Sequence, residues 1–597
     1  MSVNLFFLST KQNNTYLFTR RLVERTRRVL KVNIMETPFT AIAELCEKLE
    51  ATRKRLPKID LVADFLKSLD AEEVEPAVSM LLGRPFPKWS QQTLDLSWST
   101  LSGTIKRITG VEWSVFMDAF SKTGDIGSAT KTAFENTKVR RQATLFEKTL
   151  TIMEVRRGLT AIAETAGYGS REKKERLVEA LFSLASPLEA KYLVKIFTGD
   201  TRTGFHEGLT EQAVSKAFQI PLQTVQNAGM IMADIGEVAA KAKTEGIQAL
   251  STISFKIFRP VQLMLAQMEE DVFEALKEHG GRTAFEYKYD GARVQIHKLD
   301  DRVRIYSRRL TDVTESLPEV VQTARENILA REAVLEGEVI AVDDSGNPIP
   351  FQHLMRRFRR VHGIEDSAEK IPVRLYVFDI LYLNGESLIS APYLQRRRIL
   401  AENAGKIPLT KQIVTDKVEE AQRFLKEAMD AGHEGLMAKK IDSQYTPGIR
   451  GKRWLKIKPV LEPLDLVIVA AEYGYGRRHN WLSDYDLAAR DAETGEFLSV
   501  GKTFKGLTDA EIIEITRQLK ELTVKDEHRR TVVIPKIVVE VAYNEIQRSP
   551  KYKSGMALRF ARITRLRPDK AREEADTIQR VREIYEKQFL KKGRYKG

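Results

Sequence analysis

Lys288 is a candidate nucleophile because of its neighbours in the segment EYKYDGAR. Glu286 lies two residues before it and Asp290 two residues after it, and Gly291 and Arg293 follow. A lysine ammonium, with a pKa of about 10.4, is not nucleophilic at neutral pH, and it becomes reactive when it is desolvated or placed near other cations. Gly291 lets the backbone approach a ligand closely, and Arg293 suits a ribose or phosphate oxygen. The segment therefore predicts a covalent site for a phosphate-bearing substrate.

Other charged residues in strand-like segments could complete this site. Lys456 and Lys458, in WLKIKP, are two residues apart and are expected on one face of a strand, where they would supply the neighbouring cations. Glu338 in LEGEV and Glu434 in GHEGLMAK are candidate Mg²⁺ ligands, with Asp290 as a third candidate. Mg²⁺ takes one or two carboxylates together with phosphate oxygens, so this set fits a nucleotide-bound metal.

Arg308, Phe378 and Arg450 follow in further strand-like segments. An arginine can neutralise a phosphate, and an aromatic ring can stack on a base. For each of these residues taken alone, a solvated charge or core packing is the better explanation. The functional interpretation therefore depends on the whole set and its order along the chain.

The composition bounds the kind of protein that must position these residues. A chain of 597 residues is too long for one core and predicts two to four domains. No apolar run approaches the ~20 residues of a membrane span. The single cysteine, Cys46, excludes a disulfide framework and a cysteine-rich zinc module, and favours a reducing, cytoplasmic setting. The net charge of +14 favours a polyanionic partner, with nucleic acid first.

The periodicity of the sequence divides the chain into four parts. Residues 1–34 form an Arg-rich extension, explained either as an organelle presequence or, as we favour, as a mis-called start before Met35. Residues 35–250 show helical periodicity throughout. From 251 to 460 strand-like runs alternate with helices, which predicts an α+β domain. Residues 461–597 have the short strands of a small barrel, followed by a basic C-terminal helix.

Six short segments together resemble a known family. KYDGAR, LEGEV, YVFD, EGLMAK, WLKIK and RPDK occur in this order and match the six nucleotidyltransferase motifs of the ATP-dependent DNA ligase and RNA-capping superfamily. A lone KxDG is weak evidence, whereas the ordered set is specific. The spacings resemble those of the archaeal and eukaryotic replicative DNA ligases from about Met35 to the C-terminus. The resemblance implies an all-α DNA-binding domain, an α+β adenylation domain and an OB-fold β-barrel domain.

The resemblance also implies a reaction and roles for residues. Lys288 would attack the α-phosphate of ATP and hold AMP, which passes to the 5′-phosphate of a nick in duplex DNA before the strands are joined. Glu286 would bind the adenine amino group, and Phe378 would stack on the base. The remaining implied contacts are to the nucleotide by Arg293, Arg308, Glu338, Arg450, Lys456 and Lys458, and to Mg²⁺ (or Mn²⁺ as a substitute) by Glu338, Glu434 and Asp290.

Two further motifs are expected to act through domain movement and DNA binding. Arg567, Asp569 and Lys570, in RPDK, lie in the barrel domain and by resemblance would contact the pyrophosphate in the first step. The barrel must then close over ATP and swing away to bind DNA, with a hinge near 458–464. Arg202, in GDTRTG of the helical domain, is a candidate DNA contact.

A short segment of the helical domain resembles the sliding-clamp-binding segment of archaeal ligases. Gln142, Leu145 and Phe146 form a shortened Q-x-x-L-F pattern in RRQATLFEKTL. Such patterns occur often by chance, and the alternative is ordinary helix packing. The chain departs from the family at HNWLSDYD, where Trp481 either packs the barrel or meets DNA.

Two other functions compete with nick sealing in replication, repair and recombination. An mRNA-capping guanylyltransferase also carries KxDGxR and a barrel, but it has no reason to carry the long helical region. A non-catalytic, clamp-tethered DNA-binding protein would explain the charge, but not the ordered motifs. The expected partners are nicked duplex DNA and a sliding clamp, and the expected state is a monomer without membrane contact.

Overall fold

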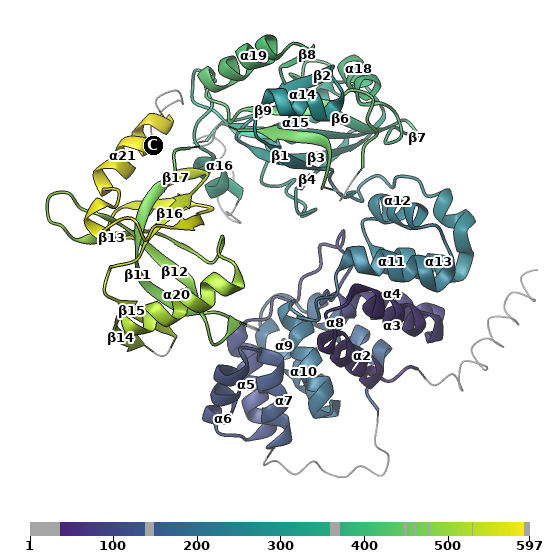
Figure 1. Cartoon of the computed structure of the whole chain (residues 1–597). Helices are drawn as coiled ribbons and strands as arrows, with labels where there is room; N and C mark the ends of the chain where they lie inside the picture. Colours follow the sequence, from purple (N-terminus) through teal and green to yellow (C-terminus); the bar gives the residue numbers. More distant parts are fainter. Residues whose placement is uncertain are drawn as a thin grey trace, which may run out of the picture.

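The chain folds into three regions that lie around a circle (Figure 1). The structure is a computed structural model, and it describes residues 36–137, 149–358, 371–446, 450–458, 461–475, 478–527 and 529–589. The predicted extension 1–34 and the clamp-type residues Gln142, Leu145 and Phe146 lie outside the described residues. A helical region, an α+β region and a strand-rich region follow one another along the chain, as the sequence predicts.

The helical region has one continuous core, which runs from Phe39 to Leu250. Sequence signals start and stop its helices: Ser186 and Glu189 form a capping box at the start of α10, and Gly199 ends that helix in the left-handed conformation. The helices are α2 (Phe39–Ala51), α3 (Arg55–Ser68), α4 (Ala71–Leu81), α5 (Trp98–Thr109), α6 (Trp113–Thr123), α7 (Ile126–Glu135), α8 (Ile152–Glu164), α9 (Ser170–Leu184), α10 (Pro187–Thr198), α11 (Glu207–Phe218), α12 (Leu222–Met232) and α13 (Ile235–Ser251).

The α+β region contains two five-stranded sheets. The first has the order β1-β10-β9-β2-β8, and the second has the order β4-β3-β5-β6-β7. The first sheet consists of β1 (Leu265–Glu269), β10 (Arg450–Ile457), β9 (Leu436–Lys440), β2 (Thr283–Tyr287) and β8 (Gln412–Thr415). The second consists of β4 (Arg302–Ser307), β3 (Ala292–Leu299), β5 (Glu332–Ala341), β6 (Val373–Leu383) and β7 (Glu386–Ser387).

Two shared cores join these sheets. One core contains Phe285 of β2 and Ile340 of β5, and another contains Trp454 of β10 and Phe378 of β6. The two sheets therefore pack against each other, and each of them carries some of the predicted site residues. The helices of this region are α14 (Val272–His279), α15 (Pro318–Asn327), α16 (Phe351–Phe358), α18 (Tyr393–Asn403) and α19 (Val418–Asp430).

The third region is a curled sheet around its own core. Strand β11 (Leu464–Tyr473) pairs with β12 and also with β15 and β16, which bends the sheet into the predicted small barrel. The other strands are β12 (Leu482–Arg490), β13 (Phe497–Thr503), β14 (Thr523–Glu527), β15 (Arg530–Val533), β16 (Val538–Ala542), β17 (Glu545–Arg548), β18 (Met556–Arg559) and β19 (Arg562–Leu566). Its helices are α20 (Asp509–Glu521), the 3₁₀ turn η3 (Arg572–Glu574) and α21 (Ile578–Phe589).

Polar and aromatic contacts join the regions to one another. The backbone N–H of Asp312 donates to Gln91 Oε1 at 2.8 Å, which joins the α+β and helical regions. The Arg529 guanidinium lies 4.0 Å from the centroid of the Tyr475 ring and 5.7 Å from that of Phe120, which joins the barrel to the helical region.

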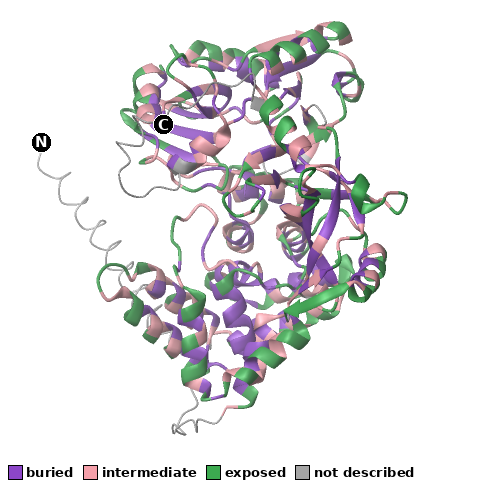
Figure 2. Ribbon diagram, turned by 90° about the vertical axis from the view of Figure 1, so that its left-hand side faces the viewer, coloured by how far each residue is buried: buried purple, intermediate pink, exposed green. Residues whose placement is uncertain are grey.

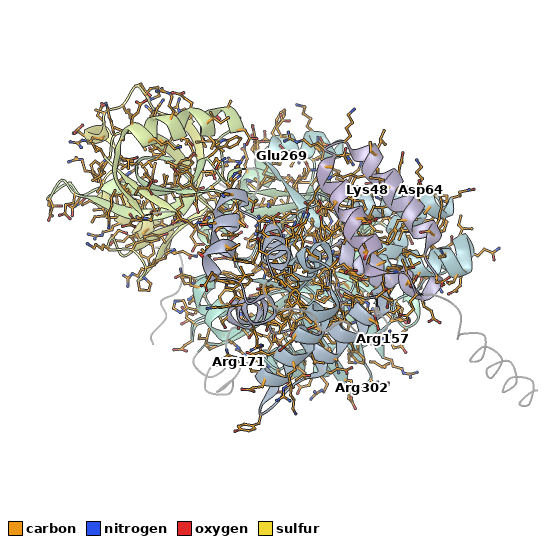
Figure 3. All side chains as sticks on the ribbon, turned by 90° about the horizontal axis from the view of Figure 1, so that it is seen from below. Lys48, Asp64, Arg157, Arg171, Glu269 and Arg302 are labelled. Carbon is orange, nitrogen blue, oxygen red and sulfur yellow. The ribbon has the colours of Figure 1, made fainter. Side chains whose placement is uncertain are left out.

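Buried residues gather inside the regions, and exposed residues lie on their outer faces (Figure 2). Charged side chains such as Asp64, Arg171 and Arg302 extend outward (Figure 3). Among the described residues, no helix has the length and apolar character that a membrane crossing requires.

Candidate active site

Lys288 lies in the loop directly after β2, and backbone pairing holds it beside Glu434. The N–H of Lys288 donates to the Gly435 carbonyl at 2.9 Å, and the N–H of Glu434 donates to the Lys288 carbonyl at 2.9 Å. Strand β2 ends at Tyr287, so Lys288 and Asp290 do not continue the strand face that carries Glu286. The chain turns after Tyr287, and Glu286 and Lys288 have different ion-pair partners.

Glu434 holds two lysines of the predicted site with one oxygen. Its Oε2 forms ion pairs with Nζ of Lys288 and with Nζ of Lys458. Burial alone would raise the pKa of Glu434, but these two cations lower it to about 2. Glu434 is therefore ionised, and it joins the loop after β2 to the end of β10.

The expectation that neighbouring lysines keep the Lys288 side chain uncharged is not supported. Burial lowers the pKa of Lys288, but Glu434, followed by Glu338 and Asp290, outweighs this effect and leaves the pKa above its ordinary value. Lys458, which we expected to lower it, has its own pKa lowered by burial and by Lys288. In the ligand-free protein Lys288 is therefore an ammonium.

The predicted metal ligands face the same ammonium without forming a complete metal site. Burial raises the pKa of Glu338 to about 7, although Lys288 and Arg293 oppose this shift. Glu434 and Asp290 raise it further, so the three carboxylates interact electrostatically. Within the described ranges, no group of three or more His, Cys, Asp or Glu side chains could hold a metal alone. The predicted magnesium site, which includes phosphate oxygens of the substrate beside these carboxylates, therefore stays a prediction.

Glu286 is bound inside the α+β region. Its Oε2 lies 2.7 Å from Nζ of Lys439, and its Oε1 accepts from the Tyr393 hydroxyl and, at 3.0 Å, from Nε2 of Gln412. Phe378 is also buried, with Nζ of Lys439 at 4.5 Å from its ring centroid. Sequence reasoning missed Lys439, although it is the last residue of the EGLMAK motif.

Arg293 is largely committed to protein partners. Its guanidinium donates to the Met264 carbonyl at 2.7 Å and to Glu336 Oε2 at 2.7 Å, and it lies 3.3 Å from the Tyr445 hydroxyl. Its buried Nε has no hydrogen-bond partner in the described part of the chain. Arg293 therefore retains one donor for the predicted ribose contact.

The other predicted nucleotide residues differ in their surroundings. Arg308 is exposed in the turn after β4, and Lys456 is half-buried on β10. Arg450 begins β10, but its side chain lies outside the described part of the protein. The structure thus brings Lys288, Lys458, Glu338 and Glu434 together and leaves Arg308 at the surface.

The barrel motif is held within the barrel itself. Nη1 of Arg567 lies 3.0 Å from both carboxylate oxygens of Asp465, and Nζ of Lys570 lies 2.6 Å from Oδ2 of Asp465. Asp569 pairs with Arg567 at 2.7 Å. A pyrophosphate contact would require Arg567 and Lys570 to exchange Asp465 for the phosphate oxygens.

Arg202 and Trp481 both occupy loops with internal contacts. Arg202 donates to Asp200 Oδ2 at 2.7 Å and to the Gly124 carbonyl at 2.5 Å, so it joins the two Gly-containing turns of the helical region. Trp481 is half-buried, and its carbonyl accepts from the Gly474 N–H at 3.0 Å. A DNA contact by Arg202 would therefore compete with its hydrogen bonds to Asp200 and Gly124.

Gly291 allows the loop after Lys288 to approach β5. A Cβ atom at this position would lie 2.8 Å from Cγ2 of Ile340 and 2.9 Å from Cγ of Glu338, and it would also overlap the Val339 carbonyl oxygen. We expect Gly291→Ala to destabilise the protein by about 1–3 kcal/mol and to reduce covalent labelling by ATP. Thermal unfolding and labelling measure these effects. Gly451→Ala, whose added Cβ meets nothing within 4 Å, is the matched control, and equal effects of the two substitutions would contradict the prediction.

Comparison with known families accounts for this arrangement. Three family models match the chain: DNA ligase N terminus over residues 38–215, ATP dependent DNA ligase domain over 263–458, and ATP dependent DNA ligase C terminal region over 478–570. The chain belongs to the ATP-dependent DNA ligase family. The matched middle region contains Lys288, Glu434 and Lys458, so the buried cluster lies within the ligase domain of the family.

Similar proteins extend this family match over nearly the full length. The DNA ligase of Thermococcus fumicolans is 44% identical over 550 residues, which cover 92% of this chain and 98% of that protein. DNA ligase 1 of Korarchaeum cryptofilum is 46% identical over 552 residues, with the same coverage. A solved structure named Pmar-Lig_PreS3 has a TM-score of 0.54 and 18% identity, covers 88% of this chain and 99% of its own, and supports the fold alone.

Proposed function

We propose that this protein seals nicks in duplex DNA with ATP, through an AMP group carried on Lys288. The observation that supports this most directly is the sharing of Glu434 by Lys288 and Lys458 in a buried cluster next to Glu338. The cluster combines a nucleophile, a second cation and two carboxylates, which are the groups that phosphoryl transfer requires. The match of all three family models supports this function over that of a capping enzyme.

In the first step Lys288 must lose a proton and attack ATP. The Nζ of Lys288 forms a bond to the α-phosphorus, and the bond from this phosphorus to the pyrophosphate oxygen breaks. Lys458 would remain next to the phosphates and offset their negative charge. The free Nε–H of Arg293 would donate to the ribose. Arg567 and Lys570 of the barrel would contact the departing pyrophosphate.

Mg²⁺, with Mn²⁺ as a substitute, is the proposed metal. Glu338 and Glu434 are suitable ligands because both are carboxylates close to Lys288, and phosphate oxygens would complete the coordination. A bound divalent ion supplies charge neutralisation at the phosphates. A ligand role for Glu434 would also loosen its ion pair with Lys288, which would favour loss of the ammonium proton.

The later steps transfer AMP to DNA and join the strands. The 5′-phosphate of the nick displaces Lys288 from the AMP phosphorus, and the 3′-hydroxyl then displaces AMP from the 5′-phosphate. The first displacement frees Lys288 for another cycle, and the second releases AMP. The helical region and the barrel would hold the duplex, consistent with the net charge of +14.

The raised pKa of Lys288 predicts a pH dependence of the first step. Because the ammonium is the dominant form, the reactive amine should increase about tenfold per pH unit below its pKa. We therefore expect the rate of self-adenylation to rise between about pH 6 and pH 8, as measured by rapid quench with α-labelled ATP.

Sealing of a nick that already carries 5′-adenylate provides the comparison. This reaction does not require a neutral Lys288, so its rate should depend less steeply on pH. A flat profile for self-adenylation, or equal slopes for the two reactions, would show that deprotonation of Lys288 does not limit the first step.

A sealing assay on nicked duplex DNA tests the whole proposal. We expect joined product that depends on ATP and a divalent metal. Labelling by GTP alone would favour the guanylyltransferase, and DNA binding without any labelling would favour the non-catalytic protein.

The remaining proposals concern partners and place of action. We infer that the protein acts as a monomer in the cytoplasm, on DNA undergoing replication, repair or recombination. We also infer that Gln142, Leu145 and Phe146 contact a sliding clamp. Calorimetry should show at least about a tenfold loss of clamp affinity in Leu145→Ala/Phe146→Ala. An unchanged affinity would remove the clamp from the proposal.

A further inference from the structure

Lys439 is a buried ammonium at the junction of the two sheets of the α+β region. It lies on β9, it is 1% exposed, and it is directly opposite Trp454 of β10. Its Nζ lies 4.4 Å from the centroid of the Trp454 ring, 4.5 Å from that of Phe378 and 4.8 Å from that of Tyr393. Its closest charged partner is Glu286, at 2.7 Å. An ammonium in such a place is costly unless ring faces and a carboxylate stabilise it.

This ammonium connects two residues that the sequence resemblance assigns to binding of the base. Glu286 would bind the adenine amino group, and Phe378 would stack on the ring. Lys439 contacts the carboxylate of Glu286 and the ring of Phe378 at the same time. The backbone of β9 fixes the position of the ammonium, because β9 pairs with β2 on one side and β10 on the other.

The hydrogen bonds of Glu286 leave room for one more donor. An ionised carboxylate only accepts hydrogen bonds and has about four acceptor sites on its two oxygens. Tyr393 and Gln412 use two sites on Oε1, and Lys439 uses one on Oε2. The remaining site is on Oε2, next to Lys439. Since the sequence resemblance places the 6-position of the base at Glu286, a base bound there must present a donor at that position.

Adenine and the 6-oxopurines differ at this atom. Adenine carries an amino donor at the 6-position, whereas guanine and hypoxanthine carry an acceptor oxygen. A 6-oxo group would face an ionised carboxylate, acceptor against acceptor. A buried carboxylate without its cation tends to take up a proton, and a protonated carboxyl can donate to an oxygen. The cation next to Glu286 thus decides which base fits.

We propose that Lys439 is a positioning residue that makes the nucleotide site selective for adenine over 6-oxopurines. It does so by keeping the adjacent Glu286 an acceptor-only group and by fixing that carboxylate relative to the Phe378 ring. This inference rests on the proposed function, since it concerns the nucleotide that Lys288 attacks. Arg397, whose Nη1 lies 3.6 Å from Glu286 Oε1, is a more distant cation on the other oxygen.

The experiment compares the full-length protein with its Lys439→Met variant. Self-nucleotidylation is measured with α-labelled ATP and with α-labelled ITP, which differ in the 6-amino and 6-oxo groups. We expect the wild-type protein to prefer ATP, and Lys439→Met to lower the ATP/ITP ratio of labelling efficiency by about tenfold or more. A purely structural role would reduce both efficiencies equally and leave the ratio unchanged, which would overturn the proposal.

Two further variants keep the result interpretable. Lys440→Met, at the next position of β9 and half-buried, should leave the ATP/ITP ratio at the wild-type value. Glu286→Gln has nearly the shape of Glu286 but offers both a donor and an acceptor, so it should lower the ratio even if Lys439→Met does not fold. An unchanged ratio in Glu286→Gln, or a wild-type protein that accepts both nucleotides equally, would overturn the role of Lys439. A wild-type protein that no nucleotide labels would contradict the proposed function itself.

Discussion

Lys288→Ala should abolish covalent labelling of the protein by α-labelled ATP. The Nζ of Lys288 forms the bond to phosphorus, and the alanine side chain offers no atom in its place. Loss of an enzyme nucleophile typically costs about 10⁵–10⁶-fold in rate, so no labelled band should appear on a gel within the time that labels the wild-type protein completely. The ion pair with Glu434 strengthens this expectation, because it holds the ammonium next to the other site residues.

Two controls distinguish the loss of the nucleophile from a loss of folding. Lys452, on β10, is exposed and pairs with Glu278, so Lys452→Ala should be labelled at the wild-type rate. Lys288→Ala should still seal a nick that already carries 5′-adenylate, because that step uses no bond to Lys288. Labelling of Lys288→Ala by ATP would show that another residue carries AMP. Loss of sealing on pre-adenylated DNA, with altered unfolding, would instead indicate a folding defect.

The sequence was sufficient to predict the order of the three regions. Helical periodicity and strand alternation are local signals, and the six motifs are local as well. The protonation state of Lys288 was not predictable in this way. The segment that carries Glu434 and Gly435 pairs with Lys288 from about 146 positions further along the chain. This carboxylate, followed by Glu338 and Asp290, outweighs the effect of burial on the pKa of Lys288.

The buried ion pairs could not be predicted from the sequence pattern either. Helix α18, with the sequence YLQRRRILAEN, looks like a polar surface helix, yet it buries Arg396 and Arg397. Arg396 pairs with Asp379 of β6, and both side chains are fully buried. Hydrophobic periodicity treats every arginine as exposed, so it cannot detect a charge whose counter-ion comes from another element.

Asp379→Ala should destabilise the α+β region more than Gly291→Ala does. It removes two hydrogen bonds to Arg396, at 2.8 Å and 3.0 Å, and leaves a guanidinium buried without its carboxylate. Breaking a buried pair in this way costs about 3–5 kcal/mol. We expect the opening free energy of β6 and α18 to fall by this amount, as measured by hydrogen exchange on peptides of the full-length protein.

A double substitution distinguishes the unpaired charge from lost packing. Replacing both partners, as in Asp379→Leu/Arg396→Met, removes the buried charge altogether and should recover much of the loss. Recovery will be incomplete, because Arg396 also donates to the carbonyls of Ala391 at 2.6 Å and Ser443 at 3.2 Å. If the double variant is instead less stable than Asp379→Ala, the pair stabilises this region by more than its desolvation costs. The buried charges next to the nucleotide site would then be a net source of stability.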